Sequence, residues 1–351
     1  MKKLNLAVVF GGKSSEHEVS LSSAKGVIGA LNKEKYNIIP IAITKSGSWL
    51  IGEKGEEYME KFKERVGKEN GISVEESESL VSSGDENIFD CMKSGKVDLV
   101  FPILHGPYGE DGKIQGFLDM LEVPYVFSGV LTHALGINKA KAKIVVKNVG
   151  VQVEEDVVID KNYNMEEILG KVGLPFVIKP MELGSSVGVS LVKTRDALKE
   201  AIDVALSYNK EVIIEKYITG REFTVTVVGN KNPEILAITE IIPKISEFYD
   251  YKAKYEKGGS EHVCPADLPE DIEKEMKQSA EKAYKALGCN DLSRADFILS
   301  EKENKPYFIE INTIPGMTPT SLAPEAAKVA GMNFTEFLDK LIEFALKRQK
   351  N

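Results

Sequence analysis

The residues best suited to chemistry lie in two strand-like runs near the C-terminus, 293–299 and 306–312. The six polar residues between them predict a hairpin loop. Because side chains alternate between the faces of a strand, pairing of Asp296 with Glu310 would create one polar face. That polar face consists of Arg294, Asp296, Glu310 and Asn312. The opposite face is then almost wholly apolar, with Ala295, Phe297, Leu299, Tyr307, Ile309 and Ile311.

The polar face has the composition of a site for a divalent cation and phosphate. Carboxylate and amide oxygens are the ligands that Mg²⁺ prefers, and so few protein ligands leave room for phosphate oxygens. Arg294 would add fixed positive charge for an oxyanion or a transferring phosphoryl group. A solvated face with a cross-strand ion pair is the simpler alternative. The turn-rich segment 313–318 after Asn312 favours the metal site.

A second candidate is the small-residue loop that follows a predicted strand ending at Lys179. Backbone N–H groups and hydroxyls of the Gly184–Gly188 loop can hold phosphates, with Lys179 adding charge. The same loop fits G-x-S-x-G, which would make Ser186 the nucleophile of a serine hydrolase. That motif requires a helix after the serine, whereas 187–192 predicts a strand, so the hydrolase is the weaker interpretation. A plain hairpin loop is the remaining alternative.

Two polar, glycine-rich loops, 11–20 and 105–112, follow predicted strands of the N-terminal region. Open α/β sheets bind ligands at that edge, so a small polar substrate is expected there. The first loop is not a phosphate-binding P-loop, because Ala7 stands where a glycine is required. Nor does it fit a zinc motif, because Leu21 stands where a second histidine is required. The aromatic and basic stretch 248–260 is long for a connection and is interpreted as either a lid or a mobile surface loop; its three tyrosines favour the lid.

The elements that must position these residues fall into three units. Strands at 4–10, 38–43 and 98–104, with a helix from Ser20, predict an α/β domain with a parallel sheet over residues 1–128. Residues 45–95 are interpreted as a surface excursion with one helix near 58–66. A central unit, 129–217, would contain a helix at 139–148 and strands at 157–159, 176–179, 189–192 and 212–216. The third unit, 218–351, would contain the lid at 246–261 and helices spanning 272–287 and 334–345, the latter behind an Asn333–Glu336 capping box.

Composition narrows the function classes further. The chain has 351 residues, enough for two or three domains, and its 45 Lys and Arg against 54 Asp and Glu give a net charge of −9. Such an acidic chain is unsuited to wrapping nucleic acid. The apolar runs are too short to cross a bilayer. Cys91, Cys264 and Cys289 form no CxxC pair, which fits a reducing compartment, so we expect a cytoplasmic protein without nucleic-acid or membrane partners.

Taken in chain order, these segments resemble the D-alanine–D-alanine ligases, a branch of the ATP-grasp superfamily. The resemblance runs from 11–22 to 316–330, with 45–95 unmatched. It implies a mixed fold, α/β in the N-terminal parallel-sheet domain and α+β in two ATP-grasp subdomains with antiparallel sheets. It also implies ATP-dependent joining of two D-alanines through an acyl phosphate, for peptidoglycan precursor synthesis. A homodimer and two Mg²⁺ ions, which Mn²⁺ can replace, complete what the resemblance implies.

The resemblance also implies roles for individual residues. For the nucleotide, Lys139 and Lys179 would hold phosphates under the loop that contains Gly184 and Ser186. Adenine would be bound by Glu215 and by the backbone of Lys216, Tyr217 and Ile218, and the ribose would be bound by Glu222. Asp296, Glu310 and Asn312 would ligate the two metal ions, with Glu310 bridging them. Glu16 would bind the ammonium of the first D-alanine and form a triad with Ser185 and Tyr255. Arg294 and the Gly316 N–H would form an oxyanion hole, Ser321 and Lys254 would steer the second D-alanine or the phosphoryl group, and His105 and Glu110 would support the site.

One departure from the family pattern and three alternatives accompany this interpretation. Met181-Glu182 follow Lys179-Pro180 where the family usually has a small residue and then Arg or Asn, so we expect Glu182 to point outward. Tyr255 fits the dipeptide-forming branch, because a branch that makes D-alanyl–D-lactate has Phe there. The alternatives are an ATP-grasp ligase with another acceptor, a serine hydrolase using Ser186, and a catalytically silent nucleotide-binding regulator.

Overall fold

The N-terminal sheet has the strand order β3-β2-β1-β4. In the computed structural model, which describes residues 2–63, 87–93, 95–244 and 258–349, β2 (Tyr36–Ile43), β1 (Leu4–Gly11) and β4 (Leu99–Ile103) run parallel. The short β3 (Trp49–Ile51) adds an antiparallel edge. Alternate residues of β1 enter two different cores, Val8 on one face and Val9 on the other. This double burial explains why the strand is a continuous apolar run.

Helices cover both faces of this sheet. They are α1 (His17–Ala30), α2 (Glu53–Lys63), α4 (Ile88–Lys93) and α5 (Lys113–Met120). The N-terminal parallel sheet is therefore as predicted. The segment 45–95 was predicted to carry one helix near 58–66; instead α2 begins at Glu53, β3 precedes it and α4 follows. Trp49 and Ile51 of β3 pack against the core on the face of the sheet that contains Val9. A strand of three residues is too short to be predicted from hydrophobic periodicity.

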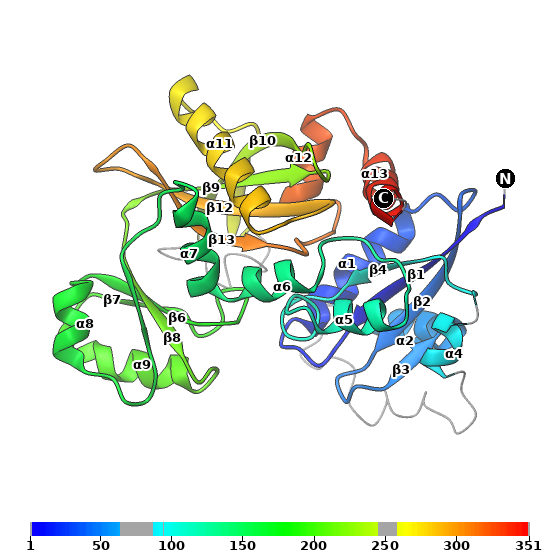
Figure 1. Cartoon of the computed structure of the whole chain (residues 1–351), viewed down its shortest axis with the longest axis horizontal. Helices are drawn as coiled ribbons and strands as arrows, with labels where there is room; N and C mark the ends of the chain where they lie inside the picture. Colours follow the sequence, from blue (N-terminus) through cyan, green and yellow to red (C-terminus); the bar gives the residue numbers. More distant parts are fainter. Residues whose placement is uncertain (1, 64–86, 94, 245–257, 350–351) are drawn as a thin grey trace.

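The central sheet, with strand order β5-β8-β6-β7, is antiparallel throughout. Its strands are β5 (Asp156–Ile159), β8 (Val212–Lys216), β6 (Phe176–Pro180) and β7 (Ser190–Val192). Its core packs against α8 (Met165–Lys171) and α9 (Leu198–Leu206), with the short η1 (Arg195–Ala197) leading into α9. The other face is left for the third sheet, and Figure 1 shows the two regions facing each other.

The third sheet, β11-β10-β9-β12-β13, is also antiparallel. Its strands are β9 (Gly220–Val228), β10 (Glu234–Pro243), β11 (Ser260–Val263), β12 (Leu292–Ser300) and β13 (Pro306–Asn312). One face packs on α7 (Lys139–Asn148) and α11 (Glu270–Ala286), while α6 (Val130–Ile137) leads in from the N-terminal region. These two antiparallel sheets confirm the predicted α+β part of the fold.

The chain returns to the N-terminal sheet through its last two helices, α12 (Leu322–Val329) and α13 (Phe334–Gln349). The predicted capping box forms, with Asn333 and Glu336 each accepting the other's backbone N–H. Apolar residues of α13 share one core with β1 and α1, and Asp339 accepts hydrogen bonds from Lys35 and Tyr36. Figure 1 shows α13 beside α1, so the C-terminal helices hold the first and third sheets together.

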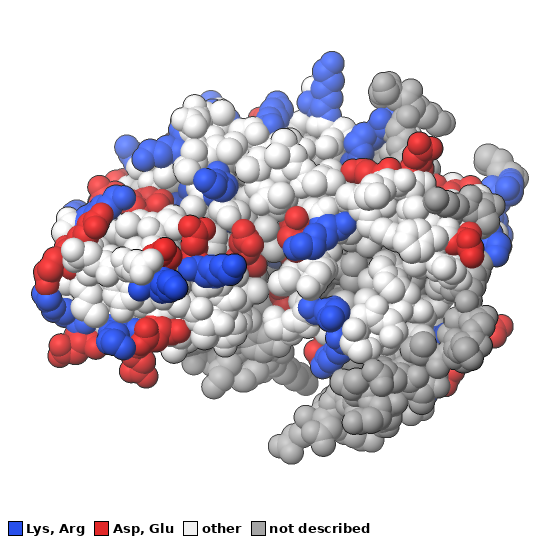
Figure 2. Space-filling model, turned by 60° about the horizontal axis from the view of Figure 1, so that its bottom comes forward, with Lys and Arg blue, Asp and Glu red and all other residues white. Residues whose placement is uncertain are grey.

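Two surface properties bear on the class of partner. Among the described residues, no helix is both long and apolar enough to cross a bilayer. On the described part of the face in Figure 2, Lys and Arg side chains are interspersed with Asp and Glu rather than forming one continuous basic surface.

Candidate active site

The β12–β13 hairpin has the predicted register at its functional end. Asp296 lies opposite Glu310, and Arg294 lies opposite Asn312. Asp296 accepts hydrogen bonds from both Nε and a terminal nitrogen of Arg294, at 3.0 and 2.9 Å. It also accepts from Asn312 Nδ2 at 2.9 Å and Thr224 Oγ1 at 2.5 Å. Arg294 and Asn312 of the polar face are therefore connected through Asp296.

The predicted apolar face was wrong at two positions. A bulge between Asp296 and Phe297 brings Phe297 opposite Phe308, so residues before the bulge on β13 change faces. Phe308 joins the core, while Tyr307 and Ile309 line a cavity. The Phe308 N–H donates to the Gln152 carbonyl at 2.9 Å, so a segment outside the hairpin shares in holding this irregular geometry.

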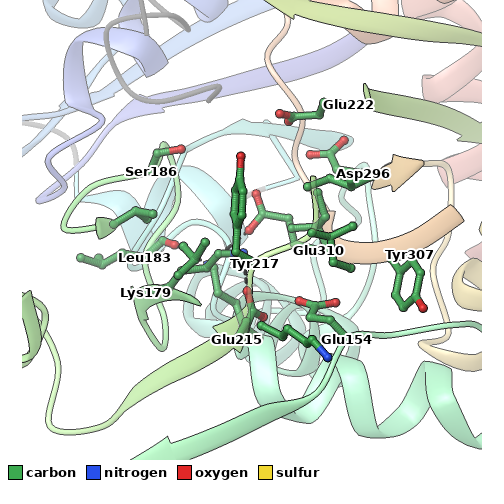
Figure 3. Close-up of a pocket in the computed structure, with 17 residues that line it drawn as sticks. Glu154, Lys179, Leu183, Ser186, Glu215, Tyr217, Glu222, Asp296, Tyr307 and Glu310 are labelled. Atoms are coloured by element: carbon green, nitrogen blue, oxygen red, sulfur yellow. Dashed lines mark hydrogen bonds and ion pairs between the residues drawn. The ribbon is translucent and has the colours of Figure 1, made fainter. Parts of the chain in front are cut away.

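The first cavity lies between the central and third sheets; its empty space, counting the part that is open to solvent, is about 880 Å³. Its walls come from α7, β6, the loop after β6, β8 and the segment after it, β12 and β13. Lysines and carboxylates alternate with apolar side chains: Lys139, Glu154, Val177, Lys179, Leu183, Ser186, Val189, Glu215, Lys216, Tyr217, Ile218, Glu222, Asp296, Ile298, Tyr307, Ile309 and Glu310. In Figure 3, Lys179 and Ser186 lie on one side and Asp296 and Glu310 on the other. Apolar walls with convergent charges suit a nucleotide.

The charges of the first cavity form ion pairs between elements. Lys139 lies 3.3 Å from Glu310, so the first residue of α7 contacts the polar face. Lys179 Nζ lies 2.5 Å from Glu215 Oε2, joining β6 to β8. Glu182 is exposed, accepts from Asn138 Nδ2 at 3.0 Å and does not line the cavity, as expected for a carboxylate kept away from phosphates.

The loop between β6 and β7 reaches across to the N-terminal domain. Ser185 Oγ donates a hydrogen bond to Glu16 Oε1, and a Cβ on Gly184 would lie 3.1 Å from Glu16 Oε2. Ser185 and Ser186 both have positive φ, 53° and 57°, which is strained for residues other than glycine. With this backbone conformation, Ser186 lines the first cavity, whereas Ser185 lines another cavity on the side of the N-terminal domain. No helix follows Ser186; a turn leads into β7, which excludes the nucleophile elbow.

The second cavity lies on the other side of that loop; its empty space, counting the part that is open to solvent, is about 1290 Å³. It is lined by Glu16, Glu18, Val19, Ser22, Ser23, His105, Glu110, Gly184, Ser185, His262, Arg294, Asn312, Ile314, Pro315, Gly316, Thr318, Thr320, Ser321 and Leu322. Asp296 and Glu310 line the first cavity, whereas Arg294 and Asn312 line the second. The polar face therefore stands between the two cavities.

His105 and Glu110 connect the N-terminal sheet to the turn after β13. His105 Nδ1 lies 3.1 Å from the Ile314 carbonyl and its Nε2 lies 3.1 Å from Ser23 Oγ. Burial lowers the pKa of His105 to about 4, so the ring is neutral; Nδ1 donates to the carbonyl and Nε2 accepts from Ser23. Glu110 accepts the N–H groups of Gly106 and Ile314 at 2.8 and 3.2 Å. Both side chains fix the segment that carries Gly316.

Gly316 and Ser321 lie close together where α12 begins. A Cβ on Gly316 would lie 3.0 Å from Ser321 Oγ, and Thr318 donates its N–H to that hydroxyl at 3.1 Å. The turn thus places the Ser321 hydroxyl and the Gly316 backbone in the lining of the same cavity as Arg294.

All of the predicted site residues that the structure describes line one of the two cavities; their roles remain predictions. Lys254 and Tyr255 lie outside the described residues, as does 246–257 of the predicted lid; the last two lid residues belong to β11. Sequence reasoning missed Lys143, Glu154, Thr224 and His262. His262 lies 2.9 Å from Glu325, on α12. The local sequence around these residues does not indicate a place in the site, because the residues that they contact lie in other segments of the chain.

The polar face fits a divalent cation bound together with phosphate. Asp296, Glu310 and Asn312 offer only oxygen atoms as metal ligands, as Mg²⁺ and Mn²⁺ require. Within the described residues no three His, Cys, Asp or Glu side chains are grouped so that they could hold a metal ion by themselves. Lys139 and Lys179 line the same cavity, where phosphate oxygens would complete the coordination.

Two antiparallel sheets on either side of a cavity lined by lysines and carboxylates, with a polar hairpin face at its edge, are the arrangement of an ATP-grasp ligase. Profiles described as "D-ala D-ala ligase N-terminus" and "D-ala D-ala ligase C-terminus" match residues 5–128 and 131–343. A D-alanine–D-alanine ligase of Chloroherpeton thalassium is 41% identical, the match covering 99% of this chain and 98% of that one. The chain belongs to the D-alanine–D-alanine ligase family.

Solved structures agree with this assignment. The VanG D-Ala:D-Ser ligase of Enterococcus faecalis has a TM-score of 0.80 and 34% identity, covering 98% of this chain and 100% of that one. A D-alanine–D-alanine ligase of Bacillus anthracis in complex with ATP has a TM-score of 0.75 and 28% identity, with 99% of each chain covered.

Proposed function

We propose that this protein joins two D-alanines to D-alanyl–D-alanine at the expense of ATP, with Mg²⁺, for peptidoglycan precursor synthesis. The observation that carries the proposal is the polar face standing between two cavities, one suited to a nucleotide and the other to small zwitterions. A carboxylate is a poor electrophile, so the carboxylate of the first D-alanine must attack the γ-phosphorus of ATP, which gives an acyl phosphate and releases ADP as the leaving group. The amine of the second D-alanine then attacks the acyl carbon and phosphate leaves.

In the first cavity, Lys139 and Lys179 bind the phosphates, Glu215 and the backbone of 216–218 hold the adenine, and Glu222 binds the ribose. Asp296, Glu310 and Asn312 would hold two Mg²⁺ ions, which neutralise phosphate charge when bound. Ser186, which lines the first cavity, and Gly184, which lines the second, belong to the loop that closes over the phosphates, and Lys254 steers the phosphoryl group or the second D-alanine.

In the second cavity, Glu16 binds the ammonium of the first D-alanine, and Ser185 ties the closing loop to it. Tyr255 completes that triad. Arg294 and the Gly316 N–H stabilise the oxyanion formed when the second amine attacks, and Ser321 orients that substrate. Closing the loop keeps water away from the acyl phosphate, which would otherwise hydrolyse.

The test is to quantify phosphate and dipeptide from Mg²⁺, ATP and D-alanine, with L-alanine in parallel. We expect equal amounts of phosphate and dipeptide with D-alanine and background amounts with L-alanine. Phosphate release independent of the stereochemistry of alanine, or a product other than a dipeptide, would contradict the proposal.

A second candidate acceptor is D-serine, because the VanG structure is that of a D-Ala:D-Ser ligase. Competition between D-alanine and D-serine in the same assay decides between them, and D-lactate tests the depsipeptide branch. Tyr255 favours the dipeptide.

We further propose domain boundaries at 1–128, 129–217 and 218–351, with a lid over 246–261. A homodimer acting in the cytoplasm is the proposed assembly. Light scattering of the purified chain, with twice the monomer mass expected, tests the dimer.

A further inference from the structure

Lys143 is a buried cation behind the wall of the first cavity. It lies on α7, one turn after Lys139, and its side chain is 2% exposed. Its Nζ donates to Glu154 Oε1 at 2.8 Å and to Glu215 Oε1 at 2.9 Å, and lies 3.3 Å from Asp156 Oδ2. Lys143 does not line the cavity, whereas Glu154 and Glu215 do.

Glu215 divides its carboxylate between two lysines. Oε1 faces Lys143, and Oε2 lies 2.5 Å from Lys179. Burial alone would raise the pKa of Glu215, but Lys179 and Lys143 outweigh it and lower that pKa to about 2. Glu215 is therefore a fixed anion whose charge two cations share.

Glu154 is a second buried acidic side chain whose charge Lys143 compensates. Its Oε1 accepts a hydrogen bond from Lys143, while its buried Oε2 has no hydrogen-bond partner among the residues that the structure describes. Burial and the neighbouring Glu215 raise the pKa of Glu154 to about 7. Lys179 is the other cation that lowers the pKa of both carboxylates, so without the Lys143 charge the two would depend on Lys179 alone, and an uncompensated buried charge is costly.

We propose that Lys143 is a positioning residue of the nucleotide site: by neutralising one oxygen of Glu215 and one of Glu154, it keeps Lys179 available to the nucleotide phosphates. The ammonium group of Lys179 has three N–H donors. It can therefore bind Glu215 and phosphate oxygens together only if the buried carboxylates do not accept hydrogen bonds from all three. This inference rests on the proposed role of Lys179 in binding phosphate.

The experiment compares Lys143→Met with Lys147→Met, which removes an exposed lysine one turn further along the same helix. Calorimetry with Mg²⁺ and a non-hydrolysable ATP analogue measures nucleotide affinity without any acceptor. We expect Kd for the analogue, and KM for ATP, to rise at least tenfold in Lys143→Met. The KM for D-alanine and kcat should change less than threefold, and Lys147→Met should match the wild type.

The double variant Lys143→Met, Glu154→Gln separates positioning from support of the fold. Removing the second carboxylate should release Lys179 and recover a large part of the lost affinity, although packing is no better than in the single variant. Unchanged affinity in Lys143→Met would overturn the proposal, as would equal rises in both KM values or a double variant no better than the single one. Because analogue binding needs no acceptor, failure of dipeptide synthesis in the wild type would reject the proposed function separately.

Discussion

Arg294 illustrates how one side chain serves two neighbours. Its guanidinium binds both oxygens of Asp296 in the first cavity while it lines the second. A bidentate pair fixes the planar group, so its remaining donors have a defined direction. Arg294 can therefore stabilise negative charge that develops at the boundary between the two cavities.

Replacing Arg294 by Met should lower kcat at least about 100-fold, since losing one oxyanion donor costs at least ~2.7 kcal/mol. Steady-state kinetics measure it, and Arg221→Met, which removes a guanidinium paired with Glu240 outside both cavities, is the control. Wild-type turnover in Arg294→Met would rule out the assigned role.

Glu110 gives a pH-dependent prediction at the same scale. Burial and the nearby Glu16 raise the pKa of Glu110 to about 8, against 4.5 in the unfolded chain, while its two N–H donors oppose the rise. Its proton then contributes stability that is complete below about pH 4.5 and lost as the pH rises through 8. Urea unfolding should therefore show the wild type losing stability relative to Glu110→Gln between pH 5 and 8.5. A constant difference would contradict the shifted pKa.

Among the elements, the loop from Gly184 to Gly188 contributes residues to both cavities. It joins the central sheet to Glu16 of the N-terminal domain through Ser185, with two serines in a strained conformation. Strain of this kind persists only where surrounding contacts maintain it.

Ser185→Ala should loosen this closure and admit water to the acyl phosphate. The expected result is a ratio of phosphate to dipeptide that rises above one, measured in the same reaction. Ser207→Ala, which changes an exposed serine at the C-terminal end of α9, should leave the ratio at one. A ratio of one in Ser185→Ala would show that the hydrogen bond to Glu16 is not needed to exclude water.

The hairpin shows what could be predicted for an element. Alternation of polar and apolar residues predicted the pairing of Asp296 with Glu310, and the structure has it. The bulge was not predictable, because Phe308, Ile309 and Tyr307 are all compatible with the core. Packing of Phe308 on Phe297, with ring centroids 5.9 Å apart, and its bond to Gln152 select the geometry.

On the scale of the whole molecule, the site depends on three sheets meeting. The loops after β1 and β4, the loop after β6, and the β12–β13 hairpin each carried a signal in the sequence. Their convergence did not follow from periodicity, because contacts such as His105 to Ile314 and Lys143 to Glu215 join distant segments. The resemblance to a known family supplied that arrangement, whereas Lys143 and Glu154 emerged only from the coordinates.

Ligand binding should also stabilise the assembled molecule. If Mg²⁺ and ATP bind between the central and third sheets, thermal unfolding should shift upward with ligand concentration, as expected for binding to the folded state alone. Glu310→Gln should lose most of the Mg²⁺-dependent part of that shift, and chelation should abolish it in the wild type. An unchanged shift in either case would argue against a metal at the polar face.

The central claim is that the carboxylate of an amino acid in the second cavity reaches the terminal phosphate of a nucleotide in the first. D-alanine labelled with ¹⁸O in both carboxylate oxygens tests this directly, by mass spectrometry of the released phosphate and the dipeptide. The account predicts one labelled oxygen in each phosphate and one retained in the new peptide carbonyl. Unlabelled phosphate, or label transferred to AMP, would contradict it.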